Sequence, residues 1–131
     1  MPGREVFKTL IITNNTKVLR HYEDRYEVLF VDGPALEVLI AARDRIHRGQ
    51  KLLTHPLAGS VKPNESPFKS VALSREAGKL DLDSLVLIEN SIATFEKFSK
   101  IKRPDLGENA GEKMKDDFRE IDLSLFTSAI G

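Results

Sequence analysis

The sequence predicts an α/β fold: a single domain over residues 1–131, with a mostly parallel four-stranded sheet flanked by helices. Short apolar, β-branched runs alternate with amphipathic segments in the first half of the chain, which is typical of parallel strands joined by helical crossovers. The run at residues 6–13 is apolar at most positions, as in strands covered on both faces. Two longer amphipathic segments close the chain. We therefore expect a three-layer arrangement like that of Rossmann-like and flavodoxin-like proteins, with two C-terminal helices.

Residues 6–13 form the first predicted strand, and a short helix follows it. Asn14 and Asn15 are both suitable N-caps, because an Asn side chain accepts hydrogen bonds from the first turn of a helix. Apolar residues at helical spacing continue to about Arg25. We therefore expect this helix to begin at the Asn pair.

Residues 26–31 form the second predicted strand, which leads directly into a helix. The sequence Asp-Gly-Pro at 32–34 marks the start of that helix, since proline suits the first helical turn. Gly49 marks its end, after several basic residues. Residues 50–54 then form the third predicted strand.

The second half of the chain predicts one more strand, at 69–74, and the two C-terminal helices. The first of these helices starts near Asp81 and has one apolar face, formed by Leu82, Leu85, Ile88, Ile92, Phe95 and Phe98. A linker at 103–111 precedes the last helix, in which one face carries Met114, Phe118, Ile121 and Leu125. Through this flexible linker, residues 104–131 either dock on the domain or swing away from it.

Strand order decides which polar residues meet. Ligands of open parallel sheets bind beyond the carboxyl ends of the strands, where the strand order reverses. With the order 2-1-3-4, Asn14 and Asn15 stand beside His55, and Asp32 lies one strand away. An order of 1-2-3 separates the Asn pair from His55. The fourth strand either adds in parallel or forms an antiparallel edge, since no helix precedes it.

Composition narrows the class of protein. The 131 residues are 40% hydrophobic and 31% charged, and no apolar run is long enough to span a membrane. Residues 1–5 lack the pattern of a secretory signal, so we expect a cytoplasmic protein. The absence of cysteine excludes disulfides, thiolate metal sites and thiol catalysis. The balance of 20 basic and 20 acidic residues argues against nucleic-acid binding.

The loop at 54–69 is the expected functional segment. It is much longer than the usual connection of about 2 to 6 residues, and it holds three of the six prolines. Its Gly59-Ser60 pair and Lys62 offer N–H groups, a hydroxyl and a cation, which suit a carboxylate or a phosphate. We expect it to bind a small anion or zwitterion at the sheet edge. The predicted ligand-binding residues are Asn14, Asn15, Asp32, His55, Ser60, Lys62 and Asn64.

His55 is the candidate catalytic residue, because it directly follows a predicted strand and histidine exchanges protons near neutral pH. The alternative is a structural histidine hydrogen-bonded to the loop backbone. A triad of Asp32, His55 and Ser60 is disfavoured, since Ser60 does not lie on a strand-to-helix elbow. His21, His47 and His55 show no metal-ligand spacing, and no nucleotide-binding motif is present. The sequence therefore predicts neither a metal nor a cofactor.

Three strings taken together resemble the GrdX family: residues 10–15, residues 26–33 and, most specifically, Lys51 to Asn64 with His-Pro-Leu-Ala-Gly-Ser-Val-Lys-Pro-Asn at its end. The resemblance covers about residues 6–100. Members of that family are encoded beside the glycine, sarcosine and betaine reductases of amino-acid-fermenting anaerobes. Proline often follows the Asn pair in the family, whereas Thr16 stands there in this chain.

The resemblance implies an accessory or regulatory role near such a reductase, and it supplies no catalytic residues. The first hypothesis is that the protein binds a small anionic or zwitterionic metabolite. The second is an assembly factor that contacts a reductase component, or a second copy of itself, through the loop or the last helix. The third is a small enzyme that uses His55 as an acid or base.

Overall fold

The structure, a computed structural model, describes residues 8–57, 66–99 and 111–130. Three strands and four helices lie in these ranges. In chain order they are β1 (Thr9–Thr13), α2 (Thr16–Tyr22), β2 (Glu27–Phe30), α3 (Ala35–His47), β3 (Ser70–Ser74), α4 (Leu82–Ser99) and α5 (Glu112–Ile130).

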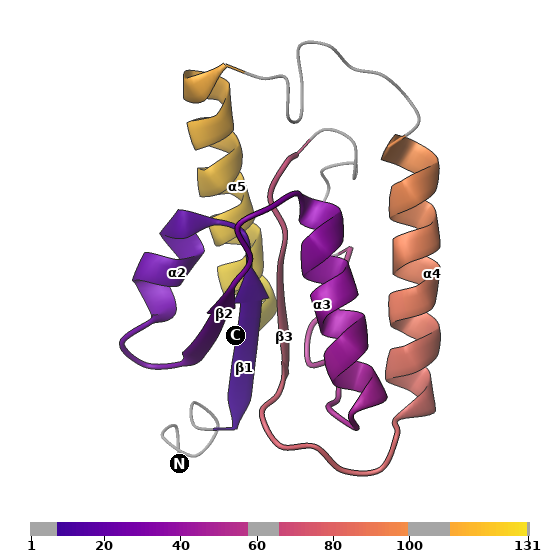
Figure 1. Ribbon diagram of the computed structural model, residues 1–131. Coiled ribbons are helices and arrows are strands. Elements are labelled where there is room, and N and C mark those ends of the chain that lie inside the picture. The colour runs from indigo at the N-terminus through magenta and orange to yellow at the C-terminus, as the bar shows by residue number, and fades with distance from the viewer. Residues whose placement is uncertain (1–7, 58–65, 100–110, 131) are drawn as a thin grey trace.

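The sheet has the order β2-β1-β3, with β1 parallel to β2 and antiparallel to β3. α3 and α4 lie together on one side of it, and α2 and α5 lie on the other (Figure 1). Successive side chains of a strand point to opposite faces, so β1 contributes side chains to two hydrophobic cores, one on each face of the sheet. Leu10 and Ile12 pack in the cluster that includes α3 and α4 residues, and Ile11 packs in the cluster that includes Phe126 of α5.

All five residues of β1 are buried, which confirms a first strand covered on both faces. The Asn cap of the first helix and the glycine stop of the second are also confirmed. Asn15 is the N-cap of α2. Gly49 follows the end of α3 with φ of 101°, a left-handed conformation that glycine adopts readily. α2 ends at Tyr22 and not near Arg25, and Pro34 is the N-cap of α3 and does not lie in its first turn.

The prediction of a mostly parallel, four-stranded Rossmann-like sheet is wrong. Among the described residues, the sheet has three strands, of which one pair is parallel. Residues 50–54 do not form a strand; Leu52 makes a single antiparallel bridge to Leu73 on the outer side of β3. β3 occupies the place beside β1 that the prediction gave to residues 50–54.

The difference has a physical reason. Val71, Ala72 and Leu73 of β3 are completely buried, so this apolar run fits between the two helical layers. In the segment 50–54, Leu53 is 51% exposed, which suits the outer edge of the sheet. Burial of the more apolar run beside β1 removes more apolar surface from water.

α5 presents a different face from the one predicted. Phe126 is buried, whereas Met114 and Ile121 are 39% and 41% exposed. Leu123 and Ile130 pack beside Phe126. The helix is therefore rotated relative to the expected apolar stripe, and this rotation turns Asp122 toward the sheet.

Within the described ranges, no helix combines the length and the apolar character that crossing a bilayer requires.

Candidate functional site

A polar cluster lies where β1 ends and β3 begins. Because the two strands are antiparallel neighbours, Thr13 is paired with Ser70. Their hydroxyl oxygens are 2.7 Å apart, and both side chains are buried. Asn14 and Asn15 follow Thr13, and Lys69 precedes Ser70, so polar residues of two segments meet at one end of the sheet.

The Asn14 side chain fixes the backbone around this cluster. Its Nδ2 donates to the backbone carbonyls of Gly33 and Pro67, both at 2.9 Å. Its Oδ1 accepts from the Lys69 N–H at 2.9 Å. The side-chain amide thus joins the start of α3 to the end of the 54–69 loop, and both its donors and its acceptor serve the backbone.

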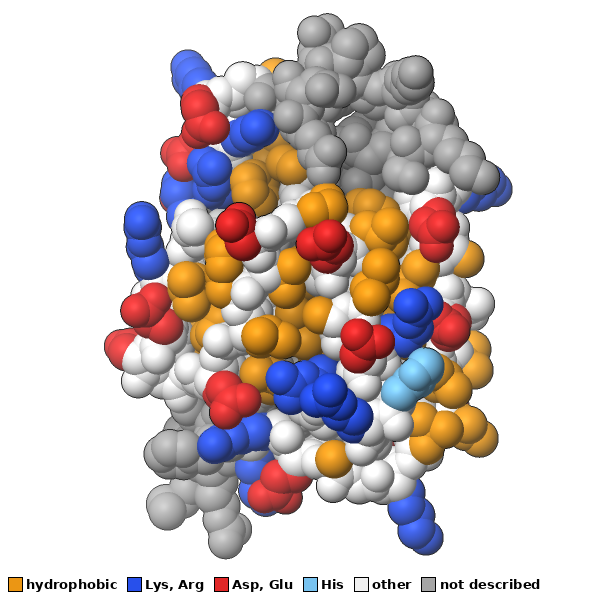
Figure 2. All heavy atoms as spheres, in the orientation of Figure 1, with side chains coloured by type: hydrophobic (Ala, Val, Ile, Leu, Met, Phe, Trp, Pro, Cys, Tyr) orange, Lys and Arg blue, Asp and Glu red, His pale blue; other side chains and the backbone are white. Residues whose placement is uncertain are grey.

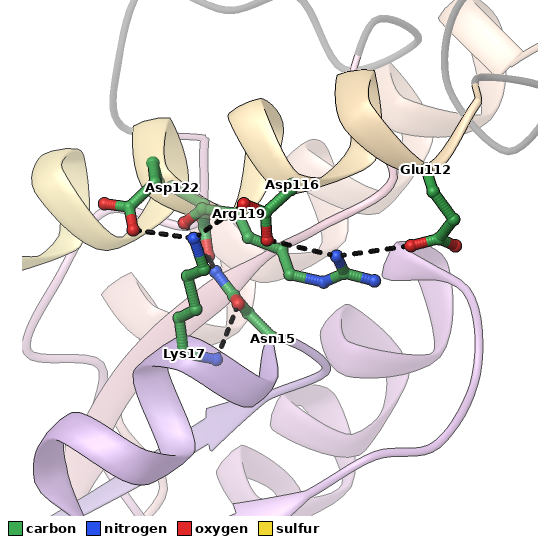
Figure 3. Close-up of polar contacts among 7 residues, drawn as sticks. Asn15, Lys17, Glu112, Asp116, Arg119 and Asp122 are labelled. Carbon is green, nitrogen blue, oxygen red and sulfur yellow. Dashed lines mark hydrogen bonds and ion pairs between the residues drawn. The ribbon is translucent and has the colours of Figure 1, made fainter.

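Asn15 joins α2 to α5. Its Oδ1 accepts from the Lys17 N–H, which caps α2, and its Nδ2 donates to the Arg119 carbonyl at 2.9 Å and to Asp122 Oδ2 at 3.0 Å. Figure 3 shows Asn15 and Lys17 facing α5. Lys17 also pairs with Asp116 and Glu120 of that helix.

Asp122 is the centre of the cluster. Besides Asn15, the Ser70 hydroxyl donates to its Oδ2, at 2.8 Å. A serine hydroxyl carries one proton, so Thr13 must be the donor in the 2.7 Å contact with Ser70. Thr13 Oγ1 in turn accepts from the Asn15 backbone N–H at 3.0 Å. The hydrogen bonds therefore run in one direction, from the start of α2 to the carboxyl group on α5.

The charged groups of the cluster are partly removed from water. Burial raises the pKa of the Asp122 carboxyl, against the hydrogen bonds from Asn15 and Ser70 and the positive charge of Lys69. Burial lowers the pKa of the Lys69 ammonium, against the negative charge of Asp122. Each group thus stabilises the charged form of the other.

Asp122 and Lys69 line one small cavity, of about 10 Å³, which has room for about one water molecule. Two kinds of side chain surround it. The polar ones, apart from the charged pair, are Thr54, His55 and Ser70, and the apolar ones are Pro56, Leu125, Phe126 and Ala129. The cavity is thus a polar hollow with an apolar wall made by α5 and Pro56.

His55 reaches this cavity from the outer side of β3. Its Nδ1 accepts a hydrogen bond from the Leu57 N–H at 3.0 Å. This bond closes a local turn, which is the backbone contact expected of a structural histidine, and a catalytic role of His55 stays a prediction. Its Nε2 is not used by that turn, and His55 also lines the cavity.

Of the other predicted ligand residues, Asp32 does not join the cluster. Asp32 is exposed and follows β2, which lies on the far side of β1 from β3. Ser60, Lys62 and Asn64 lie outside the described residues. The sequence interpretation also missed Lys69, Ser70 and Asp122. A signal for Asp122 was present, since it is a carboxylate between Ile121 and Leu123 in an amphipathic helix.

No three His, Asp or Glu side chains of the described ranges are arranged to hold a metal ion.

A family model described as GrdX-like protein matches residues 10–131 of the chain. Searches of the curated proteins and of the solved structures found no match.

Proposed function

Because the chain belongs to the GrdX-like protein family, we propose that it is an accessory or regulatory protein of glycine, sarcosine or betaine reductase metabolism. We propose further that it binds a small anionic or zwitterionic metabolite at the cavity between β3 and α5. The metabolite site is supported by one observation: the Lys69 and Asp122 side chains, both largely buried, line the same cavity.

The chemistry of this pair suits an amino acid. The Lys69 ammonium provides hydrogen-bond donors for a ligand carboxylate. Asp122 uses Oδ2 for Asn15 and Ser70, and its Oδ1 accepts no hydrogen bond from the described residues. That oxygen is the acceptor we assign to a ligand ammonium. A ligand with both charges compensates both buried groups, whereas an uncompensated buried charge is costly.

The size of the cavity sets a condition on binding. A hollow with room for about one water does not hold glycine without a change of shape. Either the Lys69 side chain turns outward or the wall formed by α5 shifts. We therefore expect binding to be coupled to the packing of α5, and larger ligands to bind more weakly than glycine.

Thermal unfolding of the full chain tests the proposal against glycine, sarcosine, betaine, acetate, acetyl phosphate and phosphate. A ligand at 100 times its dissociation constant stabilises the fold by about 2.7 kcal/mol, which raises the midpoint by about 10 °C in a domain of this size. We expect Lys69→Met to abolish the shift and Lys97→Met, on the exposed face of α4, to retain it. No shift with any compound, or equal shifts in both variants, contradicts the metabolite site.

The edge of the sheet favours a second candidate, an assembly factor that binds a reductase component. The Val31 N–H donates to the Thr13 carbonyl of β1. Backbone N–H and C=O groups of successive residues point to alternate sides of a strand, so those of Val28 and Phe30 point away from β1. β2 is the edge strand, and Val28 and Phe30 are only half-buried. Such an edge can accept a strand from another chain. Figure 2 shows apolar side chains across the middle of one face, between the α2 side and the α4 side.

Co-purification with reductase components tests this candidate. Phe30→Lys places a charge on the strand edge, and Ile121→Lys places one on the exposed face of α5 as a matched control. The assembly-factor candidate predicts that only Phe30→Lys loses the partner. Retention of the partner by both variants, with Phe30→Lys folded, excludes the β2 edge as the contact.

A further inference from the structure

Another hollow lies at the opposite end of the sheet from the site above. It has a volume of about 390 Å³, within the usual range for small-molecule sites. The start of β1, the segment after α3, the end of β3 and the turn before α4 surround it. Its lining residues are Lys8, Gly49, Lys51, Ser74, Glu76, Ala77, Gly78, Lys79 and Asp81.

Two glycines fix the shape of this hollow. Gly49 has a φ of 101°, and a Cβ atom at that position would overlap the Gly78 carbonyl oxygen. The Gly78 N–H donates to the Gly49 carbonyl at 2.9 Å. The turn before α4 is thereby held against the end of α3, and the space between them stays open.

Hydrogen bonds hold the backbone that carries two of the three lysines. The Lys8 carbonyl accepts from the Arg75 N–H at 2.7 Å. The Lys51 N–H donates to Ser74 Oγ at 2.8 Å, and its carbonyl accepts from the Ser74 N–H at 2.7 Å. Lys79 directly follows Gly78, whose contact with Gly49 fixes the turn. Lysines from three separate segments line one hollow.

The two carboxylates of the hollow balance these three cations only in part. Asp81 Oδ2 accepts from the Ser84 N–H at 3.0 Å and from Ser84 Oγ at 2.6 Å, so it is engaged at the start of α4. Glu76 is the other carboxylate of the lining. Asp81 keeps its negative charge, since the hydrogen bonds from Ser84 and the positive charge of Lys51 lower its pKa. Three cations against two carboxylates leave a local excess of one positive charge.

We propose that this hollow is a second ligand site, which binds a small molecule with at least two negative charges through Lys8, Lys51 and Lys79. Its ligand is a diphosphate or a polycarboxylate, because several ammonium groups favour an anion whose charges are spread over separate groups. This site is independent of the metabolite cavity beside Asp122, from which it differs in residues, size and ligand charge.

Isothermal titration calorimetry of the full chain tests the site, with pyrophosphate and citrate as probes. We expect saturable binding of at least one probe, and pyrophosphate and citrate distinguish phosphate from carboxylate preference. Lys51→Met/Lys79→Met should weaken binding at least about tenfold. The control Lys97→Met/Lys113→Met changes the net charge equally at exposed positions outside the hollow and should change the affinity by less than about twofold. Binding should weaken as ionic strength rises, because salt screens exposed charges.

Amide NMR spectra of the same samples locate the bound probe. The proposal predicts shifts concentrated at Gly49, Lys51 and Lys79. It is overturned if neither probe binds up to about 10 mM, if both double variants lose affinity equally, or if the shifts concentrate at Lys69 and Ser70 instead.

Discussion

Asn15 and Asp122 are 107 residues apart in the chain, yet the Asn15 side-chain amide donates to the Asp122 carboxylate at 3.0 Å. This hydrogen bond connects the start of α2 to the last helix, and the Asn15–Arg119 bond beside it makes the connection double. The C-terminal helix is therefore attached to the sheet through a specific polar contact as well as through Phe126. Both the candidate site and the stability of α5 depend on it.

Replacement of Asn15 tests that connection. Asn15→Ala removes the N-cap of α2, worth about 1 kcal/mol, and the side-chain hydrogen bonds to α5, worth about another 1 kcal/mol. We expect the free energy of unfolding, measured by urea denaturation, to fall by about 2 kcal/mol. Asn90→Ala, on the exposed face of α4, is the matched control and should change it by less than about 0.5 kcal/mol. Equal effects of the two substitutions would show that Asn15 does not hold α5.

The ionisation of Asp122 predicts a pH dependence of stability. Its folded pKa is raised by burial, so the favourable contribution is complete below its ordinary value of 3.8 and is lost as pH rises through the folded pKa. Asp122→Asn keeps the acceptor oxygen and removes the charge. The difference in unfolding free energy, variant minus wild type, should therefore increase as pH rises from about 4 to about 7.

Asp117→Asn, at an exposed position on the same helix, is the control for this measurement, because it removes one negative charge from α5 outside the cluster. A difference that decreases with pH for Asp122→Asn would mean that the folded protein favours the ionised carboxyl, contrary to a pKa raised by burial.

The contact between Gly49 and Gly78 predicts a strong asymmetry between two Gly→Ala substitutions. Gly49→Ala strains a left-handed backbone and forces a Cβ against the Gly78 carbonyl, so it should destabilise the fold by at least about 2 kcal/mol. Gly78→Ala adds a Cβ with nothing within 4 Å, so it should be nearly neutral. Differential scanning calorimetry of the two variants checks this, and comparable losses at both positions would contradict the observed packing.

Two positions on α4 test which side of that helix faces the core. Ile88 is completely buried, and Ile88→Ala should cost about 2 to 5 kcal/mol of unfolding free energy. Val86 is 58% exposed, so Val86→Ala should change it by less than about 0.5 kcal/mol. A large loss at Val86, measured by chemical denaturation, would indicate that another surface covers α4.

Local sequence patterns were sufficient to predict those elements whose structure depends mainly on residues close by in the chain. The apolar run of β1, the Asn15 cap of α2 and the stop at Gly49 were all readable from the sequence. The sheet topology was not, because two apolar runs compete for the place beside β1. The outcome depends on the complete burial of Val71–Leu73 between both helical layers, a tertiary effect that no window of residues contains.

The sequence predicted where the candidate site lies, at the end of the first strand, but it did not predict which residues form it. The sequence located Asn14 and Asn15 at the end of the first strand, but their hydrogen bonds to Pro67 and Asp122 join segments that are distant in the chain. Lys69 and Asp122 line one cavity only because β3 is antiparallel to β1 and α5 is rotated from its expected face. Neither arrangement follows from local periodicity.

The most direct test of the metabolite site is an amide NMR titration of the full chain with glycine. We expect saturable shifts centred on Ser70, Lys69 and Asp122, which disappear in Lys69→Met and persist in Lys97→Met. Shifts that are absent at saturating glycine, or that map away from the end of β1 and the start of β3, would contradict a ligand site between Lys69 and Asp122.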